Sequence, residues 1–132
     1  MHKPEGHNAV SPYLMVAEAA KALAFAKAVF GADPSFVARR EDGGIMHAEF
    51  RIDDSIVMLG QAPGGPECHV HVYVADPDDL IAKAVAAGGT LVQAPEEKGD
   101  GDRRGGVKDP TGTTWWLARM VDPQGRERTN KS

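Results

Sequence analysis

The tetrapeptide AKAV occurs twice, at residues 26–29 and again at residues 82–85. The two copies open the stretches AKAVFGADPSFV and AKAVAAGGTLVQ, in which a glycine and then a strand-like run follow. An alanine-rich run that ends at glycine is typical of a helix C-terminus, because glycine readily adopts the positive φ needed there. AKAV therefore predicts the late part of a helix, followed by a strand, at two corresponding places in the chain.

The elements around the first copy form a series of one strand, one helix and three strands. The run before Gly31 contains no internal Gly or Pro, which favours a helix. The turn Asp42-Gly43-Gly44 separates two strand-like runs. The predicted elements are the strand SPYLMV (11–16), the helix AEAAKALAFAKAVF (17–30) and the strands SFVARRED (35–42), IMHAEFRIDD (45–54) and SIVMLGQA (55–62).

The same series returns around the second copy. Asp76 suits the N-cap of a helix and Pro77 its first position, and Asp78 and Asp79 favour the positive end of the helix dipole. The predicted elements are the strand CHVHVYVA (68–75), a helix that ends at Gly88-Gly89, the strand TLVQAP (90–95) and a hairpin in RGGVKDPTGTTWWLARM (104–120) around Pro110-Thr111-Gly112. Because AKAV falls at the same place in both series, we predict an internal duplication.

The fold class predicted from this order is α+β, with two βαβββ modules. The composition changes at PGGPE, which indicates a linker, and both ends of the chain are polar and without periodicity. The predicted organisation is a flexible N-terminus (1–10), a first βαβββ module (11–62), a linker (63–68), a second βαβββ module (69–121) and a polar tail (122–132).

Composition and charge exclude several classes of function. The net charge is −4 and no basic stripe stands out, so nucleic acid is not an expected partner. No stretch is apolar over the length of a signal peptide or a membrane span, so we expect a cytoplasmic protein with no membrane partner. Cys68 is the single cysteine, which excludes an internal disulfide and a cysteine-rich zinc cluster.

Three stretches, taken in order, resemble the vicinal oxygen chelate superfamily, which includes glyoxalase I, extradiol dioxygenases, fosfomycin-modifying enzymes and bleomycin-resistance proteins. ALAFAKAVFGA (22–32) is similar to the family's first helix, with Ala26 in place of a usual tyrosine. HVHVYVADPDDLIAKAVAAGG (69–89) is similar to the opening of its second half. GDRRGGVKDPTGTTWWL (101–117) resembles the G-D-R-x-x-x-V-x-D-P-x-G signature of small bacterial glyoxalase-like proteins.

The resemblance implies a paired, glyoxalase/bleomycin-resistance-type fold, in which two curled sheets enclose an open cavity and the helices lie outside. Strand alternation then assigns the faces. Expected on the helix side are Leu14, Val16, Leu59, Val70, Val72, Val74, Trp115 and Leu117. Expected on the cavity side are Ser11, Tyr13, Met15, Ile56, Met58, Gly60, His69, His71, Tyr73, Thr114, Trp116 and Ala118.

Enzymes of this family hold a divalent metal with His and Glu on the cavity side, and their four ligand positions fall here on Ser11, Met58, His69 and Trp116. Of these, His69 alone is a good donor. The hydroxyl of Ser11 is a poor donor, the thioether of Met58 is soft, and the indole N–H of Trp116 cannot coordinate a metal. We therefore expect no metal and no other cofactor; if a metal binds, His69 is its ligand. The facing of His47 and Glu49, which are further donors, is left open by the sequence.

The resemblance to the metal-free bleomycin-resistance branch implies a small-molecule binding protein for an aromatic or amphipathic metabolite or antibiotic. The expected ligand-binding residues are Tyr13, Met58, His69, His71, Tyr73 and Trp116, and no catalytic residue is assigned. A homodimer is expected, since one module alone exposes an incomplete core. Two alternatives stay open: a divalent-metal-dependent lyase, isomerase or thiol transferase, using His69 with His71, His47 or Glu49, and an accessory domain whose cavity is filled by side chains.

Three other candidates receive structural interpretations. Cys68 and His69 are neighbours on a strand, so their side chains should point to opposite faces and form no nucleophile–base pair. Arg103 and Arg104 are expected in a loop rich in Gly and Asp, as solvated or structural charges; the alternative is that they grip an anionic ligand at a cavity mouth. Asp109 is expected to shape its turn rather than to exchange protons.

Overall fold

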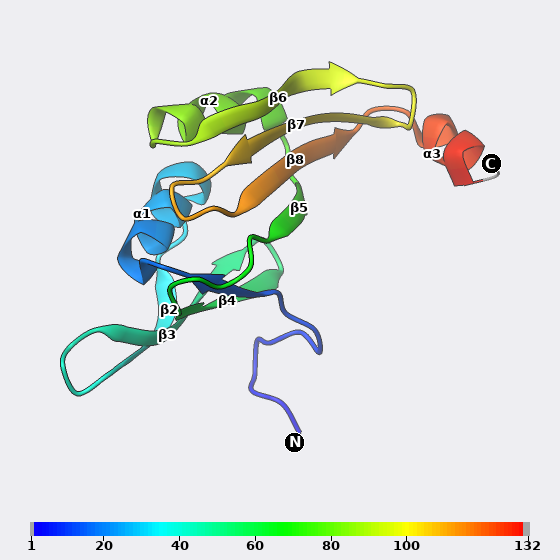
Figure 1. The fold of residues 1–132 in the computed structure, drawn as a ribbon. Helices are drawn as coiled ribbons and strands as arrows, with labels where there is room; N and C mark the ends of the chain where they lie inside the picture. Colours follow the sequence, from blue (N-terminus) through cyan, green and yellow to red (C-terminus); the bar gives the residue numbers. More distant parts are fainter. Residues whose placement is uncertain (1, 131–132) are drawn as a thin grey trace. The chain divides into compact units, whose positions relative to one another are not determined.

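The computed structural model of the protein describes residues 2–130. The chain divides into two compact units, Met1–Cys68 and His69–Ser132, and each contains a sheet of its own (Figure 1). No helix in the described part is long and apolar enough to cross a membrane.

The first unit, over its described residues, is a four-stranded sheet with one helix. The strands lie in the order β1-β4-β3-β2, with β1 parallel to β4 and the other neighbours antiparallel. In chain order the elements are β1 (Tyr13–Val16), α1 (Ala19–Phe30), β2 (Pro34–Arg39), β3 (Ile45–Ile52) and β4 (Ser55–Gln61).

The second unit repeats this plan, with the strand order β5-β8-β7-β6 and β5 parallel to β8. Its elements, as far as the structure describes them, are β5 (His69–Tyr73), α2 (Pro77–Ala86), β6 (Thr90–Glu97), β7 (Asp102–Lys108), β8 (Thr114–Met120) and α3 (Pro123–Asn130). The predicted α+β fold with two βαβββ modules is confirmed.

The predicted C-terminus of α1 and the predicted N-terminus of α2 are both found in the structure. Gly31 follows α1 with φ +66°, and its N–H donates to Lys27 O at 3.0 Å. At the start of α2, Asp76 Oδ1 accepts from Asp79 N at 3.1 Å, and Pro77 takes the first helical position. Each helix thus begins or ends at a residue whose conformation or side chain satisfies the helix terminus.

Helix α2 packs on one face of its own sheet, and Gly105 on β7 shows which face this is. A Cβ at Gly105 would overlap Ile81 Cδ1, so only glycine lets this buried side chain of α2 approach the strand. Gly105 lies opposite Leu117, which is fully buried and lies on the same side. The residues that alternate with Leu117 along β8 therefore face away from α2.

Three local expectations differ from the structure. Strand β6 continues to Glu97, and Arg103 and Arg104 lie in strand β7, so their placement in a loop is wrong. The reason is cross-strand pairing: Glu97 lies opposite Arg103 and Glu96 opposite Arg104, so charged residues that look loop-like in sequence extend the hairpin. The segment expected as a polar tail contains α3.

Candidate functional site

The second unit carries an aromatic face, made by His69, His71, Tyr73 and Trp116, on the side of its sheet away from α2. His71 lies opposite Trp116 across the parallel β5–β8 pair, and Tyr73 lies opposite Ala118. Val70 and Val72 lie opposite Trp115 and Leu117, on the helix side. The predicted alternation of β5 and β8 is confirmed, and it brings together four of the predicted ligand-binding residues.

Trp116 and His69 hold each other in place on this face. Their rings stack at a centroid distance of 6.2 Å, and Trp116 Nε1 donates to His69 Nδ1 at 3.0 Å. The indole ring lies over Gly106 of β7, where a Cβ would come within 2.7 Å of it. Because Nδ1 accepts a hydrogen bond, a neutral His69 carries its proton on Nε2 and presents an N–H donor to the surroundings.

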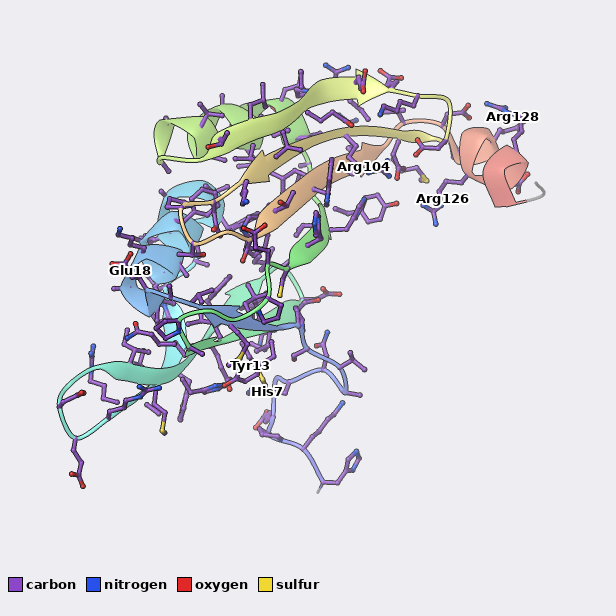
Figure 2. The ribbon with its side chains drawn as sticks, in the orientation of Figure 1. His7, Tyr13, Glu18, Arg104, Arg126 and Arg128 are labelled. Atoms are coloured by element: carbon purple, nitrogen blue, oxygen red, sulfur yellow. The ribbon has the colours of Figure 1, made fainter. Side chains whose placement is uncertain are left out.

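A second network fixes the other end of the aromatic face (Figure 2). Arg104 donates from Nε to His71 Nε2 at 3.0 Å, from Nη1 to Asp100 at 2.9 Å and from Nη2 to Asp102 at 2.7 Å. Burial first, and then the Arg104 charge, lower the pKa of His71. His71 is therefore held neutral, as an acceptor from Arg104 must be.

Tyr73 joins the same network through its hydroxyl group. It donates to Asp102 Oδ2 at 2.8 Å and accepts from Arg126 Nη1 of α3 at 2.7 Å. Burial and the hydrogen bond to Asp102 raise the pKa of Tyr73. The tyrosine ring itself stays half-exposed beside His71, at a centroid distance of 4.9 Å. The face thus combines exposed ring surface with polar atoms that already have partners.

Arg104 and Arg126 belong to this site, although neither was a predicted site residue. Arg104 lies two residues before Gly106 on β7, so it shares the face of Trp116. The alternation of β8, carried over to its neighbour β7, would have placed Arg104 on this face. Arg126 reaches Tyr73 from α3, and no periodicity in the polar tail marks that helix.

The first unit presents Tyr13 and Met58 together, as Cα partners on β1 and β4. Glu49 lies opposite Met58 across β3–β4, and His47 lies opposite Gly60. These two residues of β3, whose facing the sequence left open, therefore share the face of Tyr13. The Tyr13 ring lies over Gly60, where a Cβ would come within 2.9 Å of its hydroxyl oxygen.

Four residues of this unit form a hydrogen-bonded group, named here the Glu49 cluster: His7, Tyr13, His47 and Glu49. His7 Nε2 and His47 Nε2 each lie 2.7 Å from a different carboxylate oxygen of Glu49. His47 Nδ1 lies 3.1 Å from the Tyr13 hydroxyl, and the two rings stack at 5.4 Å. Burial raises the pKa of Glu49, but the hydrogen bonds and charges of both imidazoles outweigh it, so the pKa is lowered overall.

His7 reaches Glu49 from the segment expected to be a flexible N-terminus. Three contacts attach this segment to the sheet: His7 to Glu49, Arg51 Nη2 to Gly6 O at 2.7 Å, and Asn8 Nδ2 to Ser55 Oγ at 3.4 Å. No pattern in residues 1–10 marks such a contact, because it depends on where β3 lies in the folded unit.

The side chains at the four family ligand positions do not fit a hard divalent cation. Ser11 precedes β1, Met58 offers a thioether, and Trp116 uses its N–H on His69. His69, with Nδ1 accepting and Nε2 protonated, has no lone pair left for a metal. Among the described residues, no group of three or more His, Cys, Asp or Glu side chains is arranged to hold a metal ion.

The remaining candidates behave as structural residues. Asp109 accepts from Thr111 N, Thr111 Oγ1, Thr113 N and Trp115 Nε1 at 2.7–3.1 Å, which confirms its role in the turn. Cys68 donates to Pro66 O at 3.7 Å, while His69 bonds Trp116, so these neighbours do not pair. Arg103 forms ion pairs with Asp78 and Glu97.

Comparison with known proteins decides the family. The model of the Glyoxalase/Bleomycin resistance protein/Dioxygenase superfamily matches residues 7–117. The chain belongs to this superfamily. It is 35% identical over 127 residues to the protein Mb0911c of Mycobacterium bovis, covering 86% of this chain and 84% of that protein.

Several solved structures share the fold of this chain. TioX from Micromonospora sp. ML1 has a TM-score of 0.72 at 26% identity, covering 86% of this chain and 99% of TioX. FosX from Listeria monocytogenes, a fosfomycin resistance protein, has a TM-score of 0.70 at 16% identity, covering 90% and 97%. A glyoxalase/bleomycin resistance protein from Catenulispora acidiphila has a TM-score of 0.65 at 18% identity, covering 85% and 97%.

Proposed function

We propose that this superfamily member is a metal-free small-molecule binding protein whose ligand is an aromatic or amphipathic metabolite or antibiotic. The observation that carries the proposal is the aromatic face of the second unit. Its rings are exposed to a ligand, while the polar atoms of Trp116, His71 and Tyr73 are held by protein partners. Planar molecules bind well to such preorganised ring surfaces, because little side-chain entropy is lost on binding.

The hydrogen-bonding capacity of this face favours a ligand with acceptor groups. His69 offers Nε2–H and His71 offers Nδ1–H, since each uses its other ring nitrogen as an acceptor. Both donors lie beside ring surface, so a planar molecule that carries a carbonyl or carboxylate oxygen would be complementary. The superfamily description names bleomycin resistance proteins, which supports including antibiotics in the proposed ligand class.

The competing function is a divalent-metal-dependent lyase, isomerase or thiol transferase with His69 as a ligand. The tautomer of His69 and the side chains of Met58 and Trp116 argue against it. The distinguishing measurement is the melting temperature with added manganese, zinc, nickel or iron, because a metal that prefers the folded state raises stability. Stoichiometric metal binding together with turnover would overturn the proposal.

Ligand binding is tested with 1-anilinonaphthalene-8-sulfonate, an aromatic anion, followed by fluorescence titration. Replacing Trp116 with Ala should weaken binding at least about fivefold, because ring stacking contributes about 1 kcal/mol beyond buried area. Val85→Ala is the matched control, since Val85 is an exposed apolar residue of α2, on the other side of the sheet. Equal binding by the wild type and the Trp116→Ala variant would contradict the assignment of the face.

We also propose that the protein is a homodimer. Strands β2 and β6 each form an edge of their own sheet and expose apolar side chains: Phe36 and Val37 on β2, and Leu91 and Val92 on β6. Exposed apolar edges favour association. Light scattering coupled to size-exclusion chromatography should give twice the chain mass, and a monomer at micromolar concentration would refute this.

A further inference from the structure

The Glu49 cluster ends at a phenol whose proton points into the protein. Glu49 is 8% exposed and its pKa is lowered, so it is an ionised acceptor between two imidazoles. His47 must then carry its proton on Nε2, which lies 2.7 Å from Glu49 Oε2. The Nδ1 of a neutral His47 is consequently an acceptor, and the Tyr13 hydroxyl, 3.1 Å away, donates to it.

This orientation decides what Tyr13 can offer to a bound molecule. The ring is 47% exposed, but its single proton is directed to His47, so the outward side of the hydroxyl oxygen has lone pairs only. A molecule that meets this oxygen must therefore bring a hydrogen of its own.

Apolar residues also lie beside the Tyr13 and His47 rings. Met58 lies opposite Tyr13 across the strand pair, and Gly60 lies under the ring. Phe36, 53% exposed, packs its ring edgewise against His47 at 5.8 Å. Such a site suits a planar, largely apolar molecule with one acidic hydrogen.

We propose that Tyr13, His47 and Glu49 form a proton relay that removes an acidic C–H, N–H or O–H hydrogen from a planar apolar molecule. The proton of the bound molecule passes to the Tyr13 oxygen while the original phenolic proton passes to His47 Nδ1. The electron pair of the broken bond stays on the molecule, and the imidazolium is stabilised by Glu49. The relay resets when the proton returns through Tyr13 to product or water.

The three residues have different roles. Tyr13 contacts the molecule and is the catalytic residue, and His47 stores the proton. Glu49 is a positioning residue: it holds His47 in the tautomer that can accept from Tyr13, and it stabilises the charge that forms. The inference adds proton transfer to the proposed binding function and depends only on residues of the first unit.

The probe for this activity is 5-nitrobenzisoxazole, which is planar, apolar and free of other reactive hydrogens. Removal of its ring C–H proton forms the nitrile as the N–O bond breaks, and the released phenolate is coloured. No other reactant is required. The wild-type protein should raise the rate above that in buffer.

Variants of Tyr13 and Glu49 distinguish a proton relay from a hydrogen-bonded group that only stabilises the fold. Tyr13→Phe keeps the ring and removes the oxygen, and should lower the rate about 100-fold, the low end of general acid–base contributions. Glu49→Gln should also lower the rate and change the tautomer of His47 in proton–nitrogen spectra, because an amide can donate to His47 Nε2 and place the ring proton on Nδ1. The matched controls are Glu41→Gln and His2→Gln, which lie outside the cluster and should keep the wild-type rate. Melting curves establish that each variant is folded.

Two results would overturn the relay: a Tyr13→Phe variant with the wild-type rate, or a wild-type protein no faster than buffer. Proton–nitrogen spectra of the histidine rings test it without turnover, since His47 must be protonated on Nε2 and not on Nδ1. If the dye binds at the Trp116 face but the probe is not accelerated, this inference fails while the proposed binding function stands. If the probe is accelerated but the dye does not bind, the relay stands and the proposed binding function fails.

Discussion

The substitution Gly106→Ala tests the architecture of the aromatic face most directly. A Cβ at this position would lie 2.7 Å from Trp116 Cζ3 and 2.8 Å from Cε3. Carbon atoms in contact lie about 3.5–4.0 Å apart, so the indole must withdraw by about 1 Å. This movement pulls Trp116 Nε1 away from His69 Nδ1, which now lies at 3.0 Å.

The expected loss of stability has two parts. Overpacking costs about 1–3 kcal/mol, and the low end applies because the half-buried Trp116 can move outward. The weakened hydrogen bond to His69 adds about 0.5–1 kcal/mol. We therefore expect a decrease of about 2 kcal/mol in the free energy of unfolding, together with weaker binding of the aromatic dye.

The assay is urea unfolding of a double-mutant cycle with Trp116→Ala. Without the indole, the alanine at position 106 meets no ring, so Gly106→Ala should change stability by less than about 0.5 kcal/mol in that background. An equal cost of Gly106→Ala with and without the Trp116 ring would refute the reasoning, because the clash would then lie elsewhere.

Three further predictions concern buried and titratable groups. Asp109→Ala removes an acceptor of four hydrogen bonds and should destabilise the protein by about 3 kcal/mol in urea unfolding, whereas Asp42→Ala, in an exposed turn, should cost under about 1 kcal/mol. The pKa of Glu49 is lower in the folded state, so its stabilisation is complete above the unfolded value of about 4.3 and is lost as pH falls through the folded pKa. The stability difference between the wild type and Glu49→Gln should therefore shrink on acidification, and a constant difference from pH 7 to pH 3 would contradict this. The pKa of His71 is also lower in the folded state, so the unfolded chain binds more protons below its value of about 6.5 and stability should fall there as pH drops. His71→Gln should lose this dependence, and a ring titration of His71 by NMR at or above the ordinary histidine value would disprove it.

Much of the fold follows from local sequence signals. Gly31 and Asp76 mark helix ends with little help from distant residues, because φ preference and capping act within one turn. The alternation in His69–Tyr73 assigns the faces of β5 by itself, because successive side chains of a strand point to opposite sides.

The candidate site was predicted only in part. His69, His71, Tyr73 and Trp116 were placed on one face because β5 and β8 alternate cleanly. His47 and Glu49 could not be assigned to the cavity face or the helix face from the sequence. Alternation shows that they share a face of β3, but which face this is depends on the register with β4. Arg104 was misplaced because its partners Asp100, Asp102 and His71 are close only when the β6–β7 hairpin extends.

The amino-acid sequence alone predicts the two modules, the order of their elements, and a single good metal donor, His69, among the family's four ligand positions. Short-range forces decide these properties: backbone preference, capping and the chemistry of single side chains. Two further features depend on how the chain folds: Trp116 fixes the tautomer of His69, and His7, from outside the strands, joins His47 and Tyr13 around Glu49. The contacts of Trp116 with His69, of His7 with Glu49 and of Tyr13 with His47 join residues more than 30 positions apart in the chain. Their hydrogen bonds exist only once strand register has brought the atoms within reach.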